Sequence, residues 1–254
     1  MERNAYIRRA AGAVALGSAL ALSALVCAAA PASAQMPTLT FVGETGGDDV
    51  SLLLGSASFS ADGVGLKPVF GLTSYLLTVD GGDTDVTVEP WVGLRQRWNT
   101  GFLQGKVGYA WKSADDNDEG TTGIPLFGGG ESGVVVGGHA EYWGDGSMGL
   151  QGIGSYNTAS SFLWSRARAT FGVAPWSGGT LALGGDLVWQ GHLDDDTEIG
   201  GIEQPVNTYE ALQIGPILQW QSDRLIGGLG GGWKKIRDAD DTWYFKVELT
   251  LIPG

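Results

Sequence analysis

The most regular feature of this chain is the alternation of apolar and polar positions, which is the period of a β-strand with two different faces. Near the C-terminus the odd-numbered positions 243–251 are all apolar, and the even-numbered positions between them carry Tyr, Lys, Glu and Thr. Similar alternation recurs along the chain and is broken by clusters of Gly and Asp, which favour turns. Because no helix-period pattern of useful length follows Gln35, the sequence predicts an all-β fold.

The alternation divides the chain after Gln35 into about twelve predicted strands. They cover residues 38–44, 50–60, 65–79, 85–98, 101–113, 131–143, 147–157, 161–174, 178–191, 207–221, 224–236 and 240–252. Most are longer than the roughly 5–6 residues of an average soluble strand and reach the 9–11 residues of a membrane-spanning strand. The first two segments alternate least clearly, so ten strands is the alternative. Residues 35–254 contain no linker and are predicted to form one domain.

Alternation alone leaves two architectures open. A soluble barrel or sandwich turns its apolar face inward, whereas an outer-membrane barrel turns it outward against lipid. The tryptophans favour the second architecture, because eight of the ten lie near segment ends, where aromatic girdles meet the lipid interface. These eight are Trp98, Trp111, Trp143, Trp176, Trp189, Trp220, Trp233 and Trp243. Trp91 and Trp164 do not fit the girdles and are predicted to face the lumen.

The connections between the predicted strands differ in character from one side to the other. The odd-numbered connections include the two long loops, 114–130 and 192–206, and hold most of the acidic residues of the chain. The even-numbered connections are short, and their acidic residues are Asp62, Asp145 and Asp223. Long loops on one side and tight turns on the other are typical of outer-membrane barrels. We therefore predict an antiparallel, up-and-down transmembrane β-barrel with both termini on the short-turn side.

The first 34 residues have the pattern of a secretory signal peptide. Three arginines precede an apolar run, and Ala32-Ser33-Ala34 supplies a small-x-small cleavage site. The single cysteine, Cys27, lies within this segment, so the sequence offers no disulfide framework after cleavage. A cleaved signal peptide combined with a lipid-facing barrel predicts export across the inner membrane and location in the outer membrane.

Composition and charge exclude several other classes of protein. The formal net charge is −13 and no basic cluster interrupts it, which excludes a nucleic-acid partner. The 43 glycines have no collagen period, and a hydrophobic content of 43% is too high for a disordered chain. The remaining partner class is outer-membrane lipid.

Candidate catalytic chemistry is sparse. His139 and Glu141 lie two residues apart on one strand face, and a lipid hydrolase would need a serine beside them, for which Ser155 or Ser165 is available. We favour a charge pair in the lumen and expect no enzymatic activity. The acidic run 116–120 resembles the start of a calcium loop, but Phe127 stands where that loop needs Glu. No metal site and no cofactor are predicted.

Basic residues are paired on two predicted strands. Arg95 and Arg97 share one face, as do Arg166 and Arg168, and Trp164 lies on the face of the second pair. Such side chains could line a path for an anion or a sugar. The alternative is an interlocked set of lumen charges, with acidic partners available on other strands. These partners are Glu89, Glu141, Asp186 and Glu248.

The run Phe-Leu-Trp-Ser-Arg-Ala-Arg at 162–168 resembles a tract of the cellulose-biosynthesis protein BcsS family. Glycine-rich runs at 105–109, 137–143 and 214–216 agree with this resemblance, which extends from about residue 40 to the C-terminus. The family is similar to outer-membrane β-barrels and is associated with bacterial cellulose production. The resemblance implies cellulose or cellulose-synthase components as partners and carries no catalytic residues.

The leading hypothesis is therefore a non-enzymatic outer-membrane β-barrel that supports cellulose biosynthesis and secretion. The alternatives are a general small-solute channel, an outer-membrane lipid hydrolase using His139, and a soluble periplasmic β-barrel. The candidate site consists of lumen-facing polar and aromatic residues that could contact a saccharide. These residues are Trp164, Arg166, Arg168, Arg95, Arg97, His139 and Glu141.

Overall fold

The computed structural model describes residues 37–47, 50–79, 84–112, 132–144, 148–193, 196–199, 202–205, 210–237 and 240–252. The predicted signal peptide, 1–34, and the acidic run 116–120 lie outside these residues. No described helix is long and apolar enough to cross a membrane.

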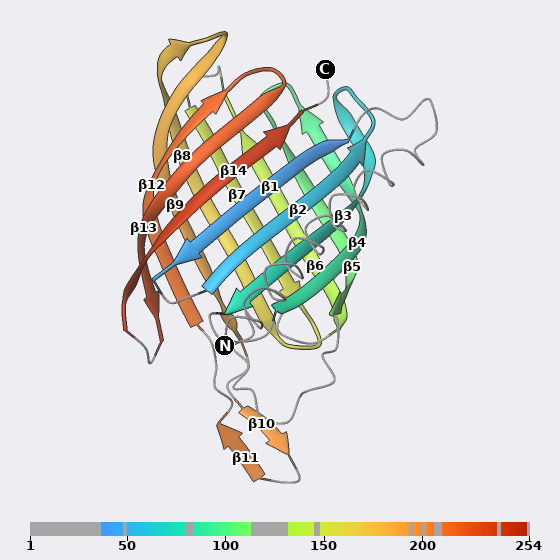
Figure 1. Ribbon diagram of the computed structural model, residues 1–254. Helices are drawn as coiled ribbons and strands as arrows, with labels where there is room; N and C mark the ends of the chain where they lie inside the picture. Colours follow the sequence, from blue (N-terminus) through green and yellow to red (C-terminus); the bar gives the residue numbers. More distant parts are fainter. Residues whose placement is uncertain are drawn as a thin grey trace, which may run out of the picture.

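Twelve antiparallel strands close into a single barrel (Figure 1). They are β1 (Thr38–Gly46), β2 (Val50–Ser60), β3 (Gly65–Val79), β4 (Thr84–Trp98), β5 (Gly101–Lys112), β6 (Gly133–Tyr142), β7 (Met148–Asn157), β8 (Phe162–Trp176), β9 (Gly179–His192), β12 (Glu210–Gln221), β13 (Leu225–Ile236) and β14 (Thr242–Leu251). Each strand pairs with its neighbours in chain order, and β1 closes the barrel against β14. The strands are 9 to 15 residues long, which matches the length needed to span a bilayer.

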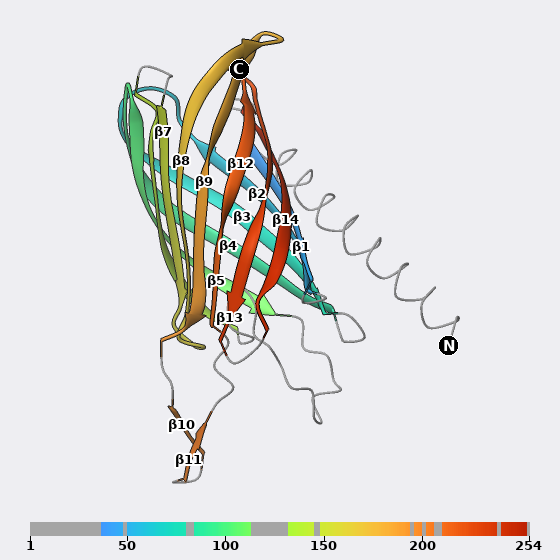
Figure 2. The same cartoon turned by 90° about the vertical axis from the view of Figure 1, so that its left-hand side faces the viewer.

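The predicted strand order is confirmed, and the ten-strand alternative is wrong. The two weakest predicted segments form β1 and β2, which pair with each other and complete the barrel wall. One further prediction needs correction, because the connection between β9 and β12 is not simply a loop. It contains a hairpin of β10 (Asp196–Ile199) and β11 (Ile202–Pro205), which projects beyond the barrel end (Figures 1 and 2). The Gly-Gly pair between these strands is the local signal that predicts such a hairpin.

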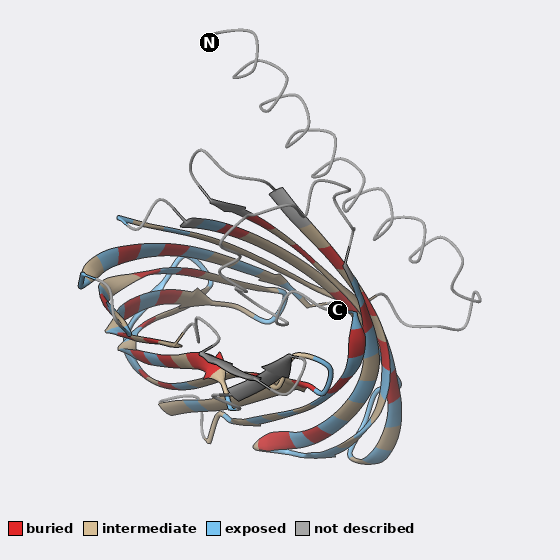
Figure 3. Ribbon diagram, turned by 90° about the horizontal axis from the view of Figure 1, so that it is seen from below, coloured by how far each residue is buried: buried red, intermediate tan, exposed pale blue. Residues whose placement is uncertain are grey.

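The barrel has its apolar face outside. On β5, Leu103 and Val107 are 56% and 46% exposed, whereas Gln104 between them is 6% exposed. A similar alternation of more exposed and more buried residues runs along other strands, most clearly β6, β12 and β14 (Figure 3). Contact of this apolar surface with water would be unfavourable in free energy, whereas contact with the hydrocarbon of a membrane is favourable. The arrangement confirms the transmembrane β-barrel class.

The tryptophans occupy the places predicted for them. Trp98, Trp143, Trp176 and Trp220 lie at the short-turn ends of their strands, whereas Trp111, Trp189, Trp233 and Trp243 lie at the long-loop ends. Trp91, in contrast, faces the lumen and is 7% exposed. Trp143 is the exception to the outward orientation, because its ring packs with the inward-facing Phe102 and Arg97. The other seven form an aromatic girdle at each end of the apolar band, as expected where a barrel meets two membrane interfaces.

Both ends of the barrel chain lie on the short-turn side. Leu39, near the start of β1, pairs with Leu251 at the end of β14. One two-residue turn on this side is Ser177-Gly178, between β8 and β9, where the φ angles are 48° and 76°. Two consecutive positive φ angles define the turn whose twist matches a β-hairpin, and glycine adopts such an angle without strain.

Candidate functional site: the barrel lumen

Five charged side chains from three strands form a buried ionic cluster in the lumen, here named the central brace. Its members are Arg166 and Arg168 of β8, Asp186 of β9, and Lys246 and Glu248 of β14. Their side chains are between 1% and 11% exposed. Alternation places all five on the inner face, as expected for the two arginines.

Each of the two carboxylates in the central brace contacts all three of its cations. Arg166 donates through Nε to Asp186 at 3.0 Å and through Nη2 to Glu248 at 2.8 Å. Arg168 reaches the same carboxylates through Nη2 at 2.9 Å and Nη1 at 2.7 Å. Lys246 donates to Asp186 and lies 3.7 Å from Glu248. Moving these strands apart would leave buried charges without partners, which costs free energy. The brace therefore holds the strands in place relative to one another.

The central brace crosses two strands to make these contacts. In the barrel order, β12 and β13 lie between β9 and β14. The residues facing the lumen on this path include Gly228 and Gly230 of β13, which pair with Glu248 and Lys246. A Cβ on Gly230 would lie 3.7 Å from Lys246 Cε, and one on Gly228 would lie 3.6 Å from Glu248 Cβ. Longer side chains here would compete with the brace for space, which explains glycine at the inward positions 228 and 230 of β13.

Toward the long-loop end, apolar side chains meet across the lumen in a cluster named here the apolar plug. It consists of buried Leu52, Tyr75, Leu77, Phe162 and Ala211, with Leu54, Trp164 and Ile236 packed against them. These residues come from β2 and β3 on one side and from β8, β12 and β13 on the other. Phe162 and Ala211 are each 1% exposed. The plug therefore fills this part of the lumen with side chains from opposite walls.

A third group lines the wall from β4 to β7. Gln104 accepts hydrogen bonds from Arg95 Nε at 2.9 Å and Nη2 at 2.7 Å. His139 Nε2 lies 2.8 Å from Glu141 Oε1, which also accepts a hydrogen bond from Gln151 at 2.6 Å. Two predicted site residues, His139 and Glu141, are thus brought into contact. Arg95 remains on the neighbouring part of the wall.

The serines considered for a hydrolase are not assembled with His139. Ser165 lies on the outer phase of β8 and donates to the carbonyl of Trp189. Ser155 faces the lumen but makes no hydrogen bond to His139, whose ring instead packs edge-on against Phe102 at 4.8 Å. Within the described residues, no group of His, Cys, Asp and Glu could hold a metal ion.

The remaining predicted site residues divide between these groups. Trp164 packs on the apolar plug, and Arg97 lies exposed near the short-turn end with its guanidinium 6.0 Å from the Trp143 ring centre. Of the four predicted acidic partners, Glu89 instead binds Lys106 at 2.6 Å. The candidate site omitted Lys246, although its position two residues before Glu248 on the same strand face is a local signal for it.

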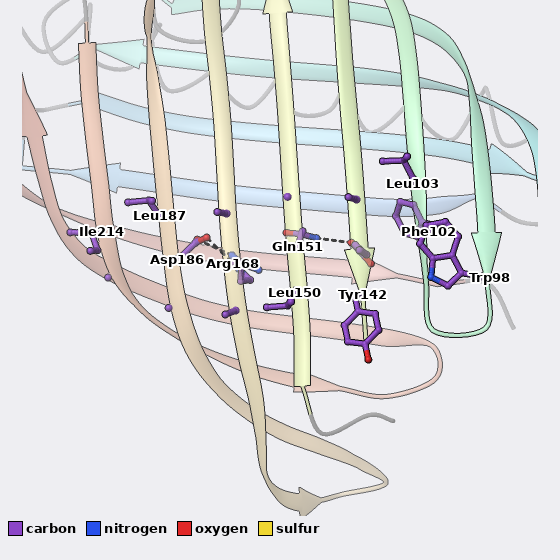
Figure 4. A pocket seen from close by; sticks show the side chains of 17 residues that line it. Trp98, Phe102, Leu103, Tyr142, Leu150, Gln151, Arg168, Asp186, Leu187 and Ile214 are labelled. Carbon is purple, nitrogen blue, oxygen red and sulfur yellow. Dashed lines mark hydrogen bonds and ion pairs between the residues drawn. The ribbon is translucent and has the colours of Figure 1, made fainter. Parts of the chain in front are cut away.

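A hollow of about 750 Å³ lies over the wall formed by β5–β9 and β12 (Figure 4). Large outward side chains, among them Leu150, Leu187 and Ile214, surround smaller outward residues such as Gly152 and Ala169. Arg168 and Asp186 point toward one another on the lumen side of the same wall. The outer surface is therefore apolar and shallowly concave where the brace is anchored inside.

No family model matches the chain, and no curated protein matches its sequence. Solved structures with a similar fold include the KdgM porin in complex with disordered oligogalacturonate, at 7% identity and a TM-score of 0.47, covering 85% of this chain and 99% of that one. LpxR from Salmonella typhimurium is 9% identical with a TM-score of 0.46 and the same coverage. The β domain of the Bordetella autotransporter BrkA is 10% identical with a TM-score of 0.43, covering 86% of this chain and 99% of the other.

Proposed function

We propose that this chain is a non-enzymatic outer-membrane barrel that supports bacterial cellulose biosynthesis and secretion, and that its lumen is held closed while it does so. The outward apolar band and the two tryptophan girdles support the outer-membrane location. The resemblance to the BcsS family supports the link to cellulose. The closed lumen makes the barrel an accessory of secretion and not the conduit of the polymer.

One observation carries this proposal. The tract at 162–168, which bears the family resemblance, supplies Phe162 to the apolar plug and Arg166 and Arg168 to the central brace. Trp164, between them, packs on the plug. The inward-facing residues of the tract that marks the resemblance therefore help to fill the lumen.

The bonding of Arg166 and Arg168 favours bracing over contact with a sugar. Both guanidiniums already donate to Asp186 and Glu248, and their side chains are 8% and 6% exposed. A saccharide hydroxyl would have to displace a charge-assisted hydrogen bond, which is about twice as strong as a neutral one. We therefore assign these arginines to the architecture of the barrel.

The test combines a gene deletion with a conductance measurement. Deletion should lower the cellulose at the cell surface, measured as glucose released by cellulase, and the wild-type gene should restore it. The purified barrel in a planar bilayer should show no steady open-channel conductance, because side chains fill its lumen. Unchanged cellulose in the deletion strain would overturn the proposal.

The same preparation separates the alternative function. Liposomes containing the purified barrel should not swell in neutral sugars of small size. Rapid swelling would favour a general small-solute channel and contradict a closed lumen. A heat-treated, unfolded sample serves as the negative control for swelling.

A further inference from the structure

We propose that the short-turn mouth of the lumen binds a multivalent oxyanion, such as a phosphate group, through Lys67, Arg95 and Arg97. These three residues are named here the basic mouth. Lys67 and Arg95 are partly exposed and Arg97 is exposed, so a ligand can reach them from the short-turn side. This site is separate from the central brace and does not depend on a role in cellulose secretion.

The register of β3 and β4 places these cations beside one another. Lys67 pairs directly with Arg95, and Arg97 follows two residues later on the same face of β4. Like charges directly opposite each other in an antiparallel pair are destabilising. Gly65 is the partner of Arg97, so no side chain from β3 covers that guanidinium. A bound anion would relieve the repulsion and occupy the space that Gly65 leaves.

The basic mouth differs from the other cations of the lumen. Lys106 pairs with Glu89, and the three cations of the central brace share Asp186 and Glu248. In the part of the barrel that the structure describes, no carboxylate lies within ion-pair distance of Lys67, Arg95 or Arg97. The mouth thus concentrates positive charge in a chain whose formal net charge is −13.

Glu141 is the carboxylate that acts on Arg95, and it does not cancel the positive charge of the basic mouth. Burial is the largest influence on the Arg95 guanidinium, followed by attraction from Glu141 and then by repulsion from Arg97. Glu141, however, is already engaged by His139 at 2.8 Å and Gln151 at 2.6 Å. Lys67, Arg95 and Arg97 carry three positive charges and Glu141 carries one negative charge, so positive charge remains in excess at the basic mouth.

The surroundings orient the guanidiniums. Gln104 holds one edge of Arg95, whose Cζ lies 4.6 Å from the ring centre of Phe102. Arg97 lies over Trp143 at 6.0 Å. An aromatic ring behind a guanidinium covers its face and leaves N–H groups at the edge free to donate. Arginine forks together with a lysine ammonium match the several acceptor oxygens of a phosphate group.

The first experiment titrates pyrophosphate into the folded barrel in dodecyl maltoside, with binding measured by calorimetry. Saturable binding is expected, and it should weaken as sodium chloride is raised because the interaction is ionic. Changing Arg95→Gln together with Arg97→Gln should weaken affinity about tenfold or more, because the variant loses two charged hydrogen-bond donors. Heat-modifiable migration on gels checks that the variant is folded.

Arg224→Gln is the matched control. Arg224 is an exposed basic residue in the turn between β12 and β13, at the same end of the barrel but outside the mouth. This control should change affinity less than about twofold, because a distant exposed charge is strongly screened. If the double variant does not fold, Lys67→Gln replaces it, with the same direction of change expected.

A second measurement distinguishes the source of the phosphate. Native mass spectrometry of the barrel extracted from membranes should detect retained phospholipid, lost in the variant, if the ligand is a lipid headgroup. Pyrophosphate binding without retained lipid supports a soluble phosphate ligand. The proposal is overturned if neither ligand binds, or if the mouth variant binds as tightly as wild type.

Discussion

The two ends of the lumen are built from different chemistry although the same strands form both. At the long-loop end, residues such as Leu77 and Phe162 meet across the barrel and exclude solvent. At the short-turn end, the inner face carries hydroxyl, amide and basic groups, with Thr40 and Thr250 hydrogen bonded at 3.2 Å and Arg97 exposed. Within the described residues, the lumen therefore contains a packed apolar cluster toward the long loops and polar groups toward the short turns.

This contrast shows that alternation sets the two faces of a strand but not what happens along one face. On β3 the inner positions change from Lys67 near the short turn to Leu77 near the long loop. Apolar groups that meet across a lumen gain stability by leaving water, whereas charged groups remain favourable only where they are hydrated or paired. The central brace lies between these two ends of the lumen, and each of its charged groups contacts a group of opposite charge.

The largest expected effect comes from breaking the central brace. Asp186→Asn would leave Arg166, Arg168 and Lys246 with Glu248 as their remaining carboxylate. Loss of one partner from a buried ionic cluster costs about 3–5 kcal/mol. Urea unfolding of the barrel in lipid vesicles, followed by tryptophan fluorescence, measures this loss.

The matched change is Glu141→Gln on the other wall. The Glu141 side chain is 27% exposed, and glutamine keeps an oxygen that can accept from Gln151. The free energy of unfolding should fall by about 1 kcal/mol or less. Equal losses in the two variants would mean that the brace is no more important than the solvated network.

The apolar plug offers the next largest effect. Leu77→Ala removes a side chain that is 4% exposed, and such truncations cost about 2–5 kcal/mol. Leu66→Ala is the control on the same strand, because Leu66 faces outward near the short turn and is 61% exposed. If Leu66→Ala is as damaging as Leu77→Ala, the plug does not seal the lumen as a packed core.

The smallest effect concerns the glycines beneath the central brace. Gly230→Leu should lower the free energy of unfolding by about 1–3 kcal/mol, because the new side chain must displace the stem of Lys246. Gly227→Leu on the same strand has open space around its Cβ position and should be nearly neutral. The same unfolding assay compares the two, and equal stability would show that the brace can shift to accommodate a leucine.

The sequence by itself determined the barrel class, the strand order and which face each strand turns to lipid. Trp91 and Trp164 were correctly assigned to the lumen because period-2 alternation and turn residues are local properties that can be read from a single strand. Strand ends were predicted to within a few residues for the same reason.

Only the tertiary structure decided which groups meet across the lumen. Arg166 and Arg168 are followed by many acidic residues in the sequence, and closure of the barrel brings Asp186 and Glu248 to them while Glu141 goes to His139. The curvature of the barrel wall likewise brings the Lys246 side chain close to Gly230, and it brings Leu77 and Phe162 into one cluster. Distances across a lumen depend on strand number and tilt together, and no single strand encodes them.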